Sequence, residues 1–223
     1  MKIYSINGGP RKNWNTARML KSFSEGALAV SPNVDVETVH LFDLKYTGCT
    51  SCFACKRNAS TYGKCALKDD IYDLLEKVSY ADGVVLGSPI YFHDITAQLR
   101  GFLERFWFPY HSFEKGEDST APKKIRSAMI YTMNVTEEQM RRGKYDVQLA
   151  TTERYMAYHF HYKPQIIYAF DTYEFDDYGK YKASIWDEAH KAELKRTQFP
   201  RDCDAAYGAG AQMVNDIITN SQS

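Results

Sequence analysis

The chain has 223 residues, which is enough for one α/β domain with a well-buried core. Basic and acidic residues balance at 28 each, so the formal net charge is zero and the composition gives no reason to expect a nucleic-acid partner. The amino terminus lacks the long apolar stretch of a signal peptide, and no apolar run approaches the roughly 20 residues of a membrane span. We therefore expect no membrane association and a cytoplasmic location, where clustered cysteines more often bind metal or react than form disulfides.

The first part of the chain predicts a strand, a loop, a helix and a second strand. Residues 1–6 are apolar enough for a strand, and the Gly-Gly-Pro sequence that follows ends it. From Asn15 or Thr16 to Leu28 the apolar residues fall at helical spacing. Residues 34–42 alternate apolar and polar side chains, which predicts a strand with one exposed face near an edge of the sheet.

A cysteine-rich loop at about residues 48–68 separates these elements from the next helix, which Asp69 or Asp70 is placed to cap. Residues 82–89 form a short and almost wholly apolar run, which is typical of a central parallel strand that is buried on both faces. An amphipathic helix is predicted at residues 97–108.

The last part of the chain continues this alternation. Two further apolar runs, at residues 123–133 and 164–173, predict strands. Residues 136–158 are helical in pattern, and residues 186–218 predict one long helix or two helices broken near Pro200. Strands that alternate with helices indicate βαβ units, and therefore a parallel sheet of the α/β class with helices on both faces.

The element order predicts a single domain over residues 1–223. Two parts exceed the minimal α/β pattern: the cysteine loop, and a C-terminal elaboration after about residue 171. The acidic and aromatic segment 170–184 either closes over a bound cofactor, joins a partner subunit, or is a solvent-exposed excursion.

The loop after the first strand, NGGPRKNWNT at residues 7–16, has the chemistry of a phosphate site. Two glycines let backbone N–H groups approach a ligand, and Arg11 supplies a charged fork. Asn15 and Thr16 add side-chain donors at the start of a helix. The loop matches neither the GxxxxGKS/T nor the GxGxxG pattern, so it predicts a site for one phosphate monoester rather than a dinucleotide. An ordinary strand-to-helix turn is the alternative.

Residues 88–105, SPIYFHDITAQLRGFLER, carry the most specific pattern of the chain. This stretch, the loop at 7–16 and the cysteine segment with its acidic pair Asp69-Asp70 resemble the NAD(P)H-dependent FMN reductase and iron–sulfur flavoprotein family of the flavodoxin-like fold. The resemblance covers roughly the first 105 residues. It implies a three-layer α/β/α sandwich whose five parallel strands have the order 2-1-3-4-5.

The resemblance implies non-covalently bound FMN. The phosphate would lie against the first loop, the ring against the loop after the third strand, and the pyrimidine side against the end of the fourth strand. The residues that the resemblance assigns to FMN are Asn7, Gly9, Pro10, Arg11, Asn15, Thr16, Pro89, Ile90, Tyr91, Phe92, Thr132, Met133 and Asn134. The family's usual serine is absent after Asn7, whose amide is the candidate to replace that hydroxyl. Ordinary packing at a strand end is the alternative for Tyr91 and Phe92.

The resemblance also implies the reaction. NAD(P)H would pass hydride to N5 of the flavin, and the reduced flavin would reduce a quinone, a free flavin, a nitro or azo compound or a metal ion. The alternative is an FMN and iron–sulfur flavoprotein that transfers electrons between protein partners, and a third hypothesis is a flavin-free regulatory protein. Flavin chemistry needs no protein nucleophile, so we predict no catalytic side chain and interpret His93 as a surface residue. The family further implies a homodimer or tetramer.

Four of the five cysteines lie in the loop. Two residues separate Cys49 from Cys52 and Cys52 from Cys55, and Cys65 follows after nine more. Four thiolates are a common ligand set for a 4Fe–4S cluster or for zinc. Iron–sulfur flavoproteins share this order but usually have a shorter last gap, and relatives without a cluster keep a similar segment. The alternative is therefore a thiol-lined loop that borders the flavin pocket. Cys203 is isolated and is expected to be inert.

Two histidines near the last predicted strand are weaker candidates for a metal site. His159 and His161 would share one face if this segment were a strand, but no third ligand is near in the sequence. We expect them to take part in aromatic packing or a polar rim.

Overall fold

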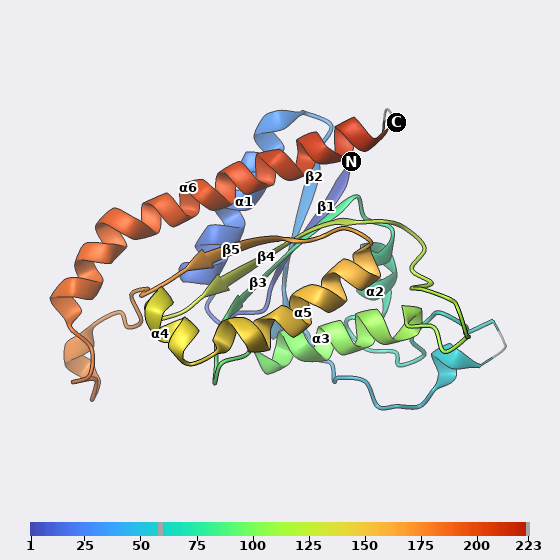
Figure 1. The fold of residues 1–223 in the computed structure, drawn as a ribbon, viewed down its shortest axis with the longest axis horizontal. Coiled ribbons are helices and arrows are strands. Elements are labelled where there is room, and N and C mark those ends of the chain that lie inside the picture. The colour runs from blue at the N-terminus through green and yellow to red at the C-terminus, as the bar shows by residue number, and fades with distance from the viewer. Residues whose placement is uncertain (58–59, 222–223) are drawn as a thin grey trace.

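Within residues 1–57 and 60–221, which the computed structural model describes, five parallel strands form one central sheet (Figure 1). The strands are β1 (Lys2–Asn7), β2 (Asp35–His40), β3 (Gly83–Pro89), β4 (Arg126–Thr132) and β5 (Gln165–Ala169). Their order is β2-β1-β3-β4-β5, so the predicted flavodoxin-like order is confirmed. Because all strands are parallel, their carboxyl ends meet at one edge of the sheet.

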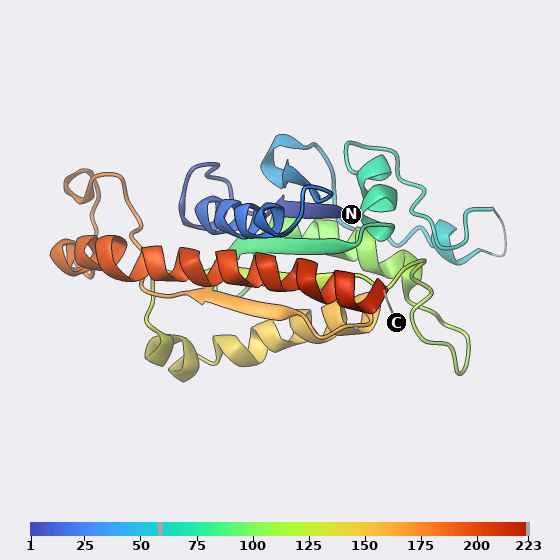
Figure 2. The ribbon, with the colours of Figure 1, turned by 90° about the horizontal axis from the view of Figure 1, so that it is seen from above.

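Helices cover both faces of the sheet, as Figures 1 and 2 show from two sides. The helices are α1 (Asn15–Val30), α2 (Tyr72–Ser79), α3 (Ala97–Trp107), α4 (Glu137–Arg142), α5 (Tyr145–Phe160) and α6 (Glu188–Ser221). Short 3₁₀ turns are η1 (Leu41–Asp43), η2 (Ala54–Lys56), η3 (Phe108–Tyr110) and η4 (Tyr178–Lys180). Since α1 and α6 pack on one face and α2, α3 and α5 on the other, the predicted three-layer sandwich is confirmed.

The burial of each strand follows its place in the sheet. Every residue of β3 before Pro89 is buried, because β3 lies in the middle and helices cover both of its faces. The edge strand β2 has no fully buried residue, as its alternating pattern predicts. One core packs Ile3 and Phe23 beneath α1 and α6, and the other packs Phe102 and Tyr131 beneath α3 and α5. Each such side chain stabilises the fold by about 1.5–3 kcal/mol through burial.

The long helix α6 continues through Pro200, so the single-helix alternative is the correct one. Phe199 beside the proline is buried against α1, and this packing holds the helix where the ring removes a backbone hydrogen bond. At Gly26 of α1 a Cβ atom would lie 2.0 Å from the carbonyl oxygen of Tyr207 in α6. The two helix backbones therefore approach as closely as only glycine permits. None of the described helices combines the length and apolarity that crossing a membrane requires.

The segment predicted as one helix at 136–158 is two helices. Thr136 and Gln139 form a capping box that starts α4. The helix ends at Gly143, and Lys144 adopts a left-handed conformation with φ of 57° before α5 begins. The break lets α4 turn toward the carboxyl edge of the sheet, where the loops after the strands gather (Figure 1).

The two histidines considered for a metal lie on helix α5 and at its end, so their placement on one face of a strand was wrong. His159 is buried, stacks on Trp107 and Tyr155, and has Nδ1 3.3 Å from Oγ of Ser119. His161 ends the helix in a left-handed conformation and is exposed. The expectation of aromatic packing is confirmed for His159.

We predict that His159 makes the protein less stable in mild acid. Burial, with smaller contributions from the nearby positive charges of His111 and His161, lowers the pKa of His159 to about 3. Between about pH 6.5 and pH 3 the unfolded chain binds a proton that the folded protein excludes, so stability falls as pH falls through this window. At pH 5 the loss relative to pH 7 is about 2 kcal/mol.

Thermal unfolding at pH 7 and pH 5 measures this effect. His159→Gln should lose much of the wild-type difference in Tm between the two pH values, whereas the exposed control His161→Gln should keep it. An equal pH dependence in wild type and His159→Gln would contradict the prediction.

Candidate functional site

A pocket lies at the carboxyl edge of the sheet, where the loops after β1, β3, β4 and β5 converge. Its volume is about 110 Å³. The residues that line it are Gly9, Pro10, Arg11, Trp14, Asn15, Thr16, Pro89, Ile90, Tyr91, Thr132, Met133, Asn134, Thr172 and Glu174. The structure thus brings together all the residues that the resemblance assigned to FMN, except Asn7 and Phe92. We name this the carboxyl-edge pocket.

The loop after β1 is held by close backbone packing. The N–H of Gly8 donates to the carbonyl oxygen of Gly87 at 2.8 Å, and the hydroxyl of Thr96 donates to the carbonyl of Gly8 at 2.7 Å. A Cβ atom on Gly8 would lie 2.8 Å from the Cβ of Leu99. The glycine is therefore required for the loop to lie against β3 and the start of α3.

Asn7 shapes this loop rather than lining the pocket. It is fully buried, and its side-chain oxygen accepts a 2.8 Å hydrogen bond from the N–H of Gly9. Its amide nitrogen lies 3.1 Å from Nδ1 of His40. The Asn7 side chain is therefore engaged within the loop, and its replacement of the missing serine hydroxyl stays a prediction.

The amino terminus of α1 opens into the pocket with its donors available. Trp14 occupies the N-cap position without a side-chain cap, and no acidic residue stands in the first turn. The buried indole Nε1 of Trp14 has no hydrogen-bond partner among the described residues. The hydroxyls of Thr16 and Thr132 lie 2.7 Å apart, and since that contact uses one hydroxyl hydrogen, the other is left for a ligand. An anion at this helix end would meet several unsatisfied donors.

Glu174 closes the pocket from the C-terminal elaboration. Arg11 donates to both the backbone oxygen and Oε1 of Glu174, at 2.7 and 3.0 Å, and Asn134 donates to Oε2 at 3.3 Å. Asn15 donates to the backbone oxygen of Tyr173 at 2.9 Å. The carboxylate of Glu174 thus lies between donors of the first loop and the end of β4. Sequence reasoning missed this residue, and the only signal was the acidic character of segment 170–184.

The loop after β3 places its aromatic residues on different sides. Tyr91 lines the pocket, and a short antiparallel bridge to Asp94 fixes its backbone. Burial raises the pKa of Tyr91, so its hydroxyl stays protonated near neutral pH. Phe92 is fully exposed and has a left-handed φ of 49°, so it does not line the pocket. His93 stacks on Tyr145 at the surface, with ring centroids 3.8 Å apart.

The end of β4 is fixed by the sheet and by α6. The N–H of Met133 donates to the carbonyl oxygen of Ala169 at 3.0 Å, so this backbone donor is taken. The buried ammonium of Lys191 donates to the carbonyl oxygen of Asn134 at 2.6 Å and to the carboxylate of Asp171. The first turn of α6 therefore positions the loops after β4 and β5 on either side of the pocket.

The four loop cysteines line a second, smaller pocket, which we name the cysteine pocket. Ser51 and Phe53 have left-handed φ angles of 53° and 55°, which turn the loop back on itself. Cys52 is exposed and Cys55 is buried. All four cysteines line one cavity of about 20 Å³, yet no three metal-ligating side chains within residues 1–57 and 60–221 are arranged to hold a single metal ion.

The cysteine pocket shares no lining residue with the carboxyl-edge pocket, and the interpretation that the cysteine loop borders the flavin stays a prediction. Thr96 at the start of α3 touches the first loop, whereas Arg105 near the end of α3 touches the cysteines. They are nine positions apart in the helix, which is about 13 Å along its axis. Figure 1 shows the cysteine loop at the opposite end of α3 from the tips of the strands.

Arg105 connects the cysteine loop to α3. Its buried guanidinium donates to Sγ of Cys65 at 3.1 Å and forms a two-pronged ion pair with Asp69 at 2.6 and 3.1 Å. It also donates to the backbone oxygens of Thr47 and Leu67. All five N–H groups of the side chain are thereby used. Sequence reasoning placed Arg105 in a family motif but gave it no role.

The electrostatic setting of the thiols is mixed. Burial raises the pKa of the Cys55 thiol, partly offset by the adjacent charge of Lys56. The guanidinium of Arg105 donates a hydrogen bond to the sulfur of Cys65. A thiolate at the buried Cys55 therefore needs a further positive group, which is what a metal centre supplies.

The model of the NADPH-dependent FMN reductase family matches residues 1–148, and the chain belongs to this family. An iron–sulfur flavoprotein from Methanocaldococcus jannaschii is 35% identical over 105 residues, which is 47% of this chain and 51% of that protein. An iron–sulfur flavoprotein from Archaeoglobus fulgidus is 36% identical over 105 residues, with coverage of 47% and 48%. The matches thus span about half the length of these curated relatives.

Two solved structures share the whole architecture. The NAD(P)H:quinone oxidoreductase from Methanothermobacter marburgensis superposes with a TM-score of 0.68 at 16% identity and covers 96% of both chains. An FMN-dependent NADH-azoreductase from Bacillus anthracis, solved in complex with FMN, gives a TM-score of 0.62 at 14% identity and covers 92% of this chain and 98% of that one. At these identities the likeness shows the fold alone, and that fold is flavodoxin-like.

Proposed function

We propose that the protein is an FMN-binding, NAD(P)H-dependent oxidoreductase that reduces a quinone, flavin, nitro or azo compound or a metal ion. The observation that carries the proposal is the uncapped start of α1 at the carboxyl-edge pocket, where the indole N–H of Trp14 also lacks a partner among the described residues. Membership of the FMN reductase family supports it. The solved azoreductase with FMN supports it through the shared fold.

The residues present fit FMN. Arg11, Asn15 and Thr16 with the first-turn amides of α1 would hold the phosphate, because they offer charged and neutral donors at one point. Pro89 to Tyr91 would bound the ring on one side and Thr132 to Asn134 on the other. Phe92 lies outside the pocket, exposed on the same loop. The predicted homodimer or tetramer stays a proposal.

When bound, FMN supplies the redox chemistry, accepting hydride from NAD(P)H and passing electrons to the acceptor. The chain's own residues bind, orient and exclude water. The protonated hydroxyl of Tyr91 can donate a hydrogen bond but does not act as a base near neutral pH. No side chain among the described residues that line the pocket is placed as a proton shuttle, and we assign no catalytic acid or base.

The proposed function is tested by loading the purified protein with FMN and mixing it with NADPH or NADH without oxygen. We expect stoichiometric binding of FMN and fast loss of the visible flavin absorbance, because an enzyme must accept hydride directly. Bleaching that is slow unless a partner reductase is added would favour the electron carrier. A protein that leaves added FMN unbound would overturn both and support the flavin-free regulatory hypothesis.

Glu174 is expected to oppose FMN binding. Small-molecule and cofactor pockets usually enclose at least about 300 Å³, whereas this pocket has about 110 Å³, so we expect the segment from Thr172 to Glu174 to move outward when FMN enters. The carboxylate of Glu174 must then leave Arg11, and a dianionic phosphate takes its place. Glu174→Gln weakens the competing ion pair, which is partly exposed and worth about 1 kcal/mol.

Titration of flavin fluorescence measures this effect. Glu174→Gln should bind FMN roughly fivefold more tightly, which corresponds to about 1 kcal/mol, and should bind riboflavin, which lacks the phosphate, with little change. The control Glu117→Gln removes a carboxylate from a remote exposed loop and should leave both affinities unchanged. Equal FMN affinity in wild type and Glu174→Gln, or an equal gain for riboflavin, would refute the competition.

We propose as a second candidate function that the protein also binds an iron–sulfur cluster and transfers electrons between protein partners. The observation that favours it is the convergence of Cys49, Cys52, Cys55 and Cys65 on one pocket. A 4Fe–4S cluster is larger than a single ion and needs thiolates that are farther apart. The curated relatives named iron–sulfur flavoproteins support this candidate.

Anaerobic reconstitution with iron and sulfide tests this candidate. The wild-type protein should bind about four iron atoms per chain, and Cys52→Ser should lose most of them while it still binds FMN. Cys52 is exposed, so the substitution should not disturb folding. The control Cys203→Ser lies on α6, outside the cysteine pocket, and should keep the iron. Absence of iron from the wild type would contradict the cluster.

A further inference from the structure

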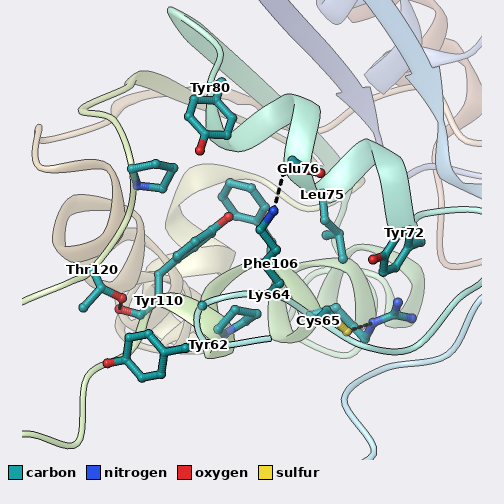
Figure 3. Close-up of a pocket in the computed structure, with 14 residues that line it drawn as sticks. Tyr62, Lys64, Cys65, Tyr72, Leu75, Glu76, Tyr80, Phe106, Tyr110 and Thr120 are labelled. Carbon is teal, nitrogen blue, oxygen red and sulfur yellow. Dashed lines mark hydrogen bonds and ion pairs between the residues drawn. The ribbon is translucent and has the colours of Figure 1, made fainter. Parts of the chain in front are cut away.

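We propose that a third pocket binds a neutral, planar aromatic molecule of one or two rings that carries a hydroxyl or carbonyl group. We name it the tyrosine pocket (Figure 3). It lies between α2, the end of α3, η3 and the loop that carries Cys65. It shares no lining residue with the carboxyl-edge pocket, so the proposal does not depend on the proposed flavin function.

Five aromatic side chains line the tyrosine pocket. Tyr72 and Tyr80 come from α2 and its end, Phe106 and Tyr110 from the end of α3 and η3, and Tyr62 from the loop. Figure 3 shows these side chains arranged around a common space, with Leu75 on the same side as Tyr72. Flat walls of this kind favour a flat ligand, which can stack on one ring and meet the edge of another.

The size of the cavity limits the ligand. Its volume is about 210 Å³. An apolar cavity of about 150 Å³ accommodates benzene, whereas drug-sized ligands need pockets of about 300 Å³ or more. The tyrosine pocket therefore fits one ring or two fused rings and excludes FMN.

The charges around the pocket are already paired, which indicates a neutral ligand. The ammonium of Lys64 lies 3.0 Å from the carboxylate of Glu76 at the rim, and Figure 3 shows this pair beside the cavity. The guanidinium of Arg105 at the other end is balanced by Asp69. A charged ligand would lose hydration without gaining a free counter-charge.

Free hydroxyl groups define the polar part of the ligand. No hydrogen bond links the hydroxyl of Tyr62, Tyr72 or Tyr80 to another described residue. A tyrosine hydroxyl both donates and accepts, so it can pair with a phenol or with a carbonyl oxygen. A hydroxyl or carbonyl edge of the ligand can pair with these hydroxyls, which a purely hydrocarbon ring cannot do.

The tyrosine pocket lies beside the cysteine pocket. Cys65 and Arg105 line both the tyrosine pocket and the cysteine pocket, so a bound ring would lie next to Cys65. The probe for a binding experiment must therefore not react with cysteine, which excludes an unsubstituted quinone.

Calorimetric titration with 2-naphthol tests the proposal, because this probe is planar, neutral, hydroxylated and unreactive toward thiols. We expect one site per chain, with the same affinity whether or not the protein is saturated with FMN. Tyr80→Ala and Tyr72→Ala should each weaken binding roughly three- to tenfold, the effect of losing one aromatic contact. Tyr80 is largely exposed, so its removal should not disturb folding. Tyr207→Ala removes a similarly exposed tyrosine from α6 and should leave the affinity unchanged.

A comparison of probes tests the charge argument. The carboxylate 2-naphthoate should bind more weakly than 2-naphthol. The inference would be overturned by no binding of 2-naphthol to the wild type, or by binding that FMN abolishes and that the Tyr80 and Tyr72 variants leave unchanged. The second result would locate the probe in the carboxyl-edge pocket. If the wild-type protein binds 2-naphthol but does not bind FMN, the flavin function is refuted and this inference stays intact.

Discussion

The position of the cysteine loop depends on the ion pair and hydrogen bonds that the buried guanidinium of Arg105 makes. Between Thr47 and Asp69 the chain has no strand and only one short 3₁₀ turn in its described part, so little regular structure holds it. Arg105 replaces that structure with bonds to Thr47, Cys65, Leu67 and Asp69. Burying an arginine is favourable only when its charge is paired and its donors are used, and removing one partner of such a pair costs about 3–5 kcal/mol. The position of the cysteine loop and its packing against the end of α3 therefore depend on the same side chain.

The carboxyl edge of the sheet is organised by a steric constraint rather than by a charge. Gly8 must lie against Gly87 and Leu99 for the first loop to reach the start of α3. This approach points the start of α1 into the pocket and brings Thr16 against Thr132. A pocket built in this way is lined by hydrogen-bond donors and by few acceptors. The carboxylate of Glu174 therefore lies at the position that an anionic ligand would also occupy.

The sequence could predict the sheet because hydrophobic periodicity and element order report burial directly. The family resemblance indicated most of the residues that line the carboxyl-edge pocket, which lies where the ends of the parallel strands converge. The contact between Arg11 and Glu174 spans 163 residues and has no local signature, so it could not be predicted. Asn7 and Phe92 were assigned to the ligand from a motif, but their direction depends on a side-chain hydrogen bond and on a left-handed φ that no periodicity encodes. The break between α4 and α5 at Lys144 likewise depends on a left-handed φ that no periodicity encodes.

The rigidity of α3 separates two kinds of chemistry within one chain. Its first turn supports the carboxyl-edge pocket through Thr96, and its last turns form the walls of the cysteine and tyrosine pockets. A helix buried along one face cannot bend to bring its ends together without losing its core contacts. Within one chain, the cysteine pocket and the carboxyl-edge pocket are therefore held apart at opposite ends of the same helix.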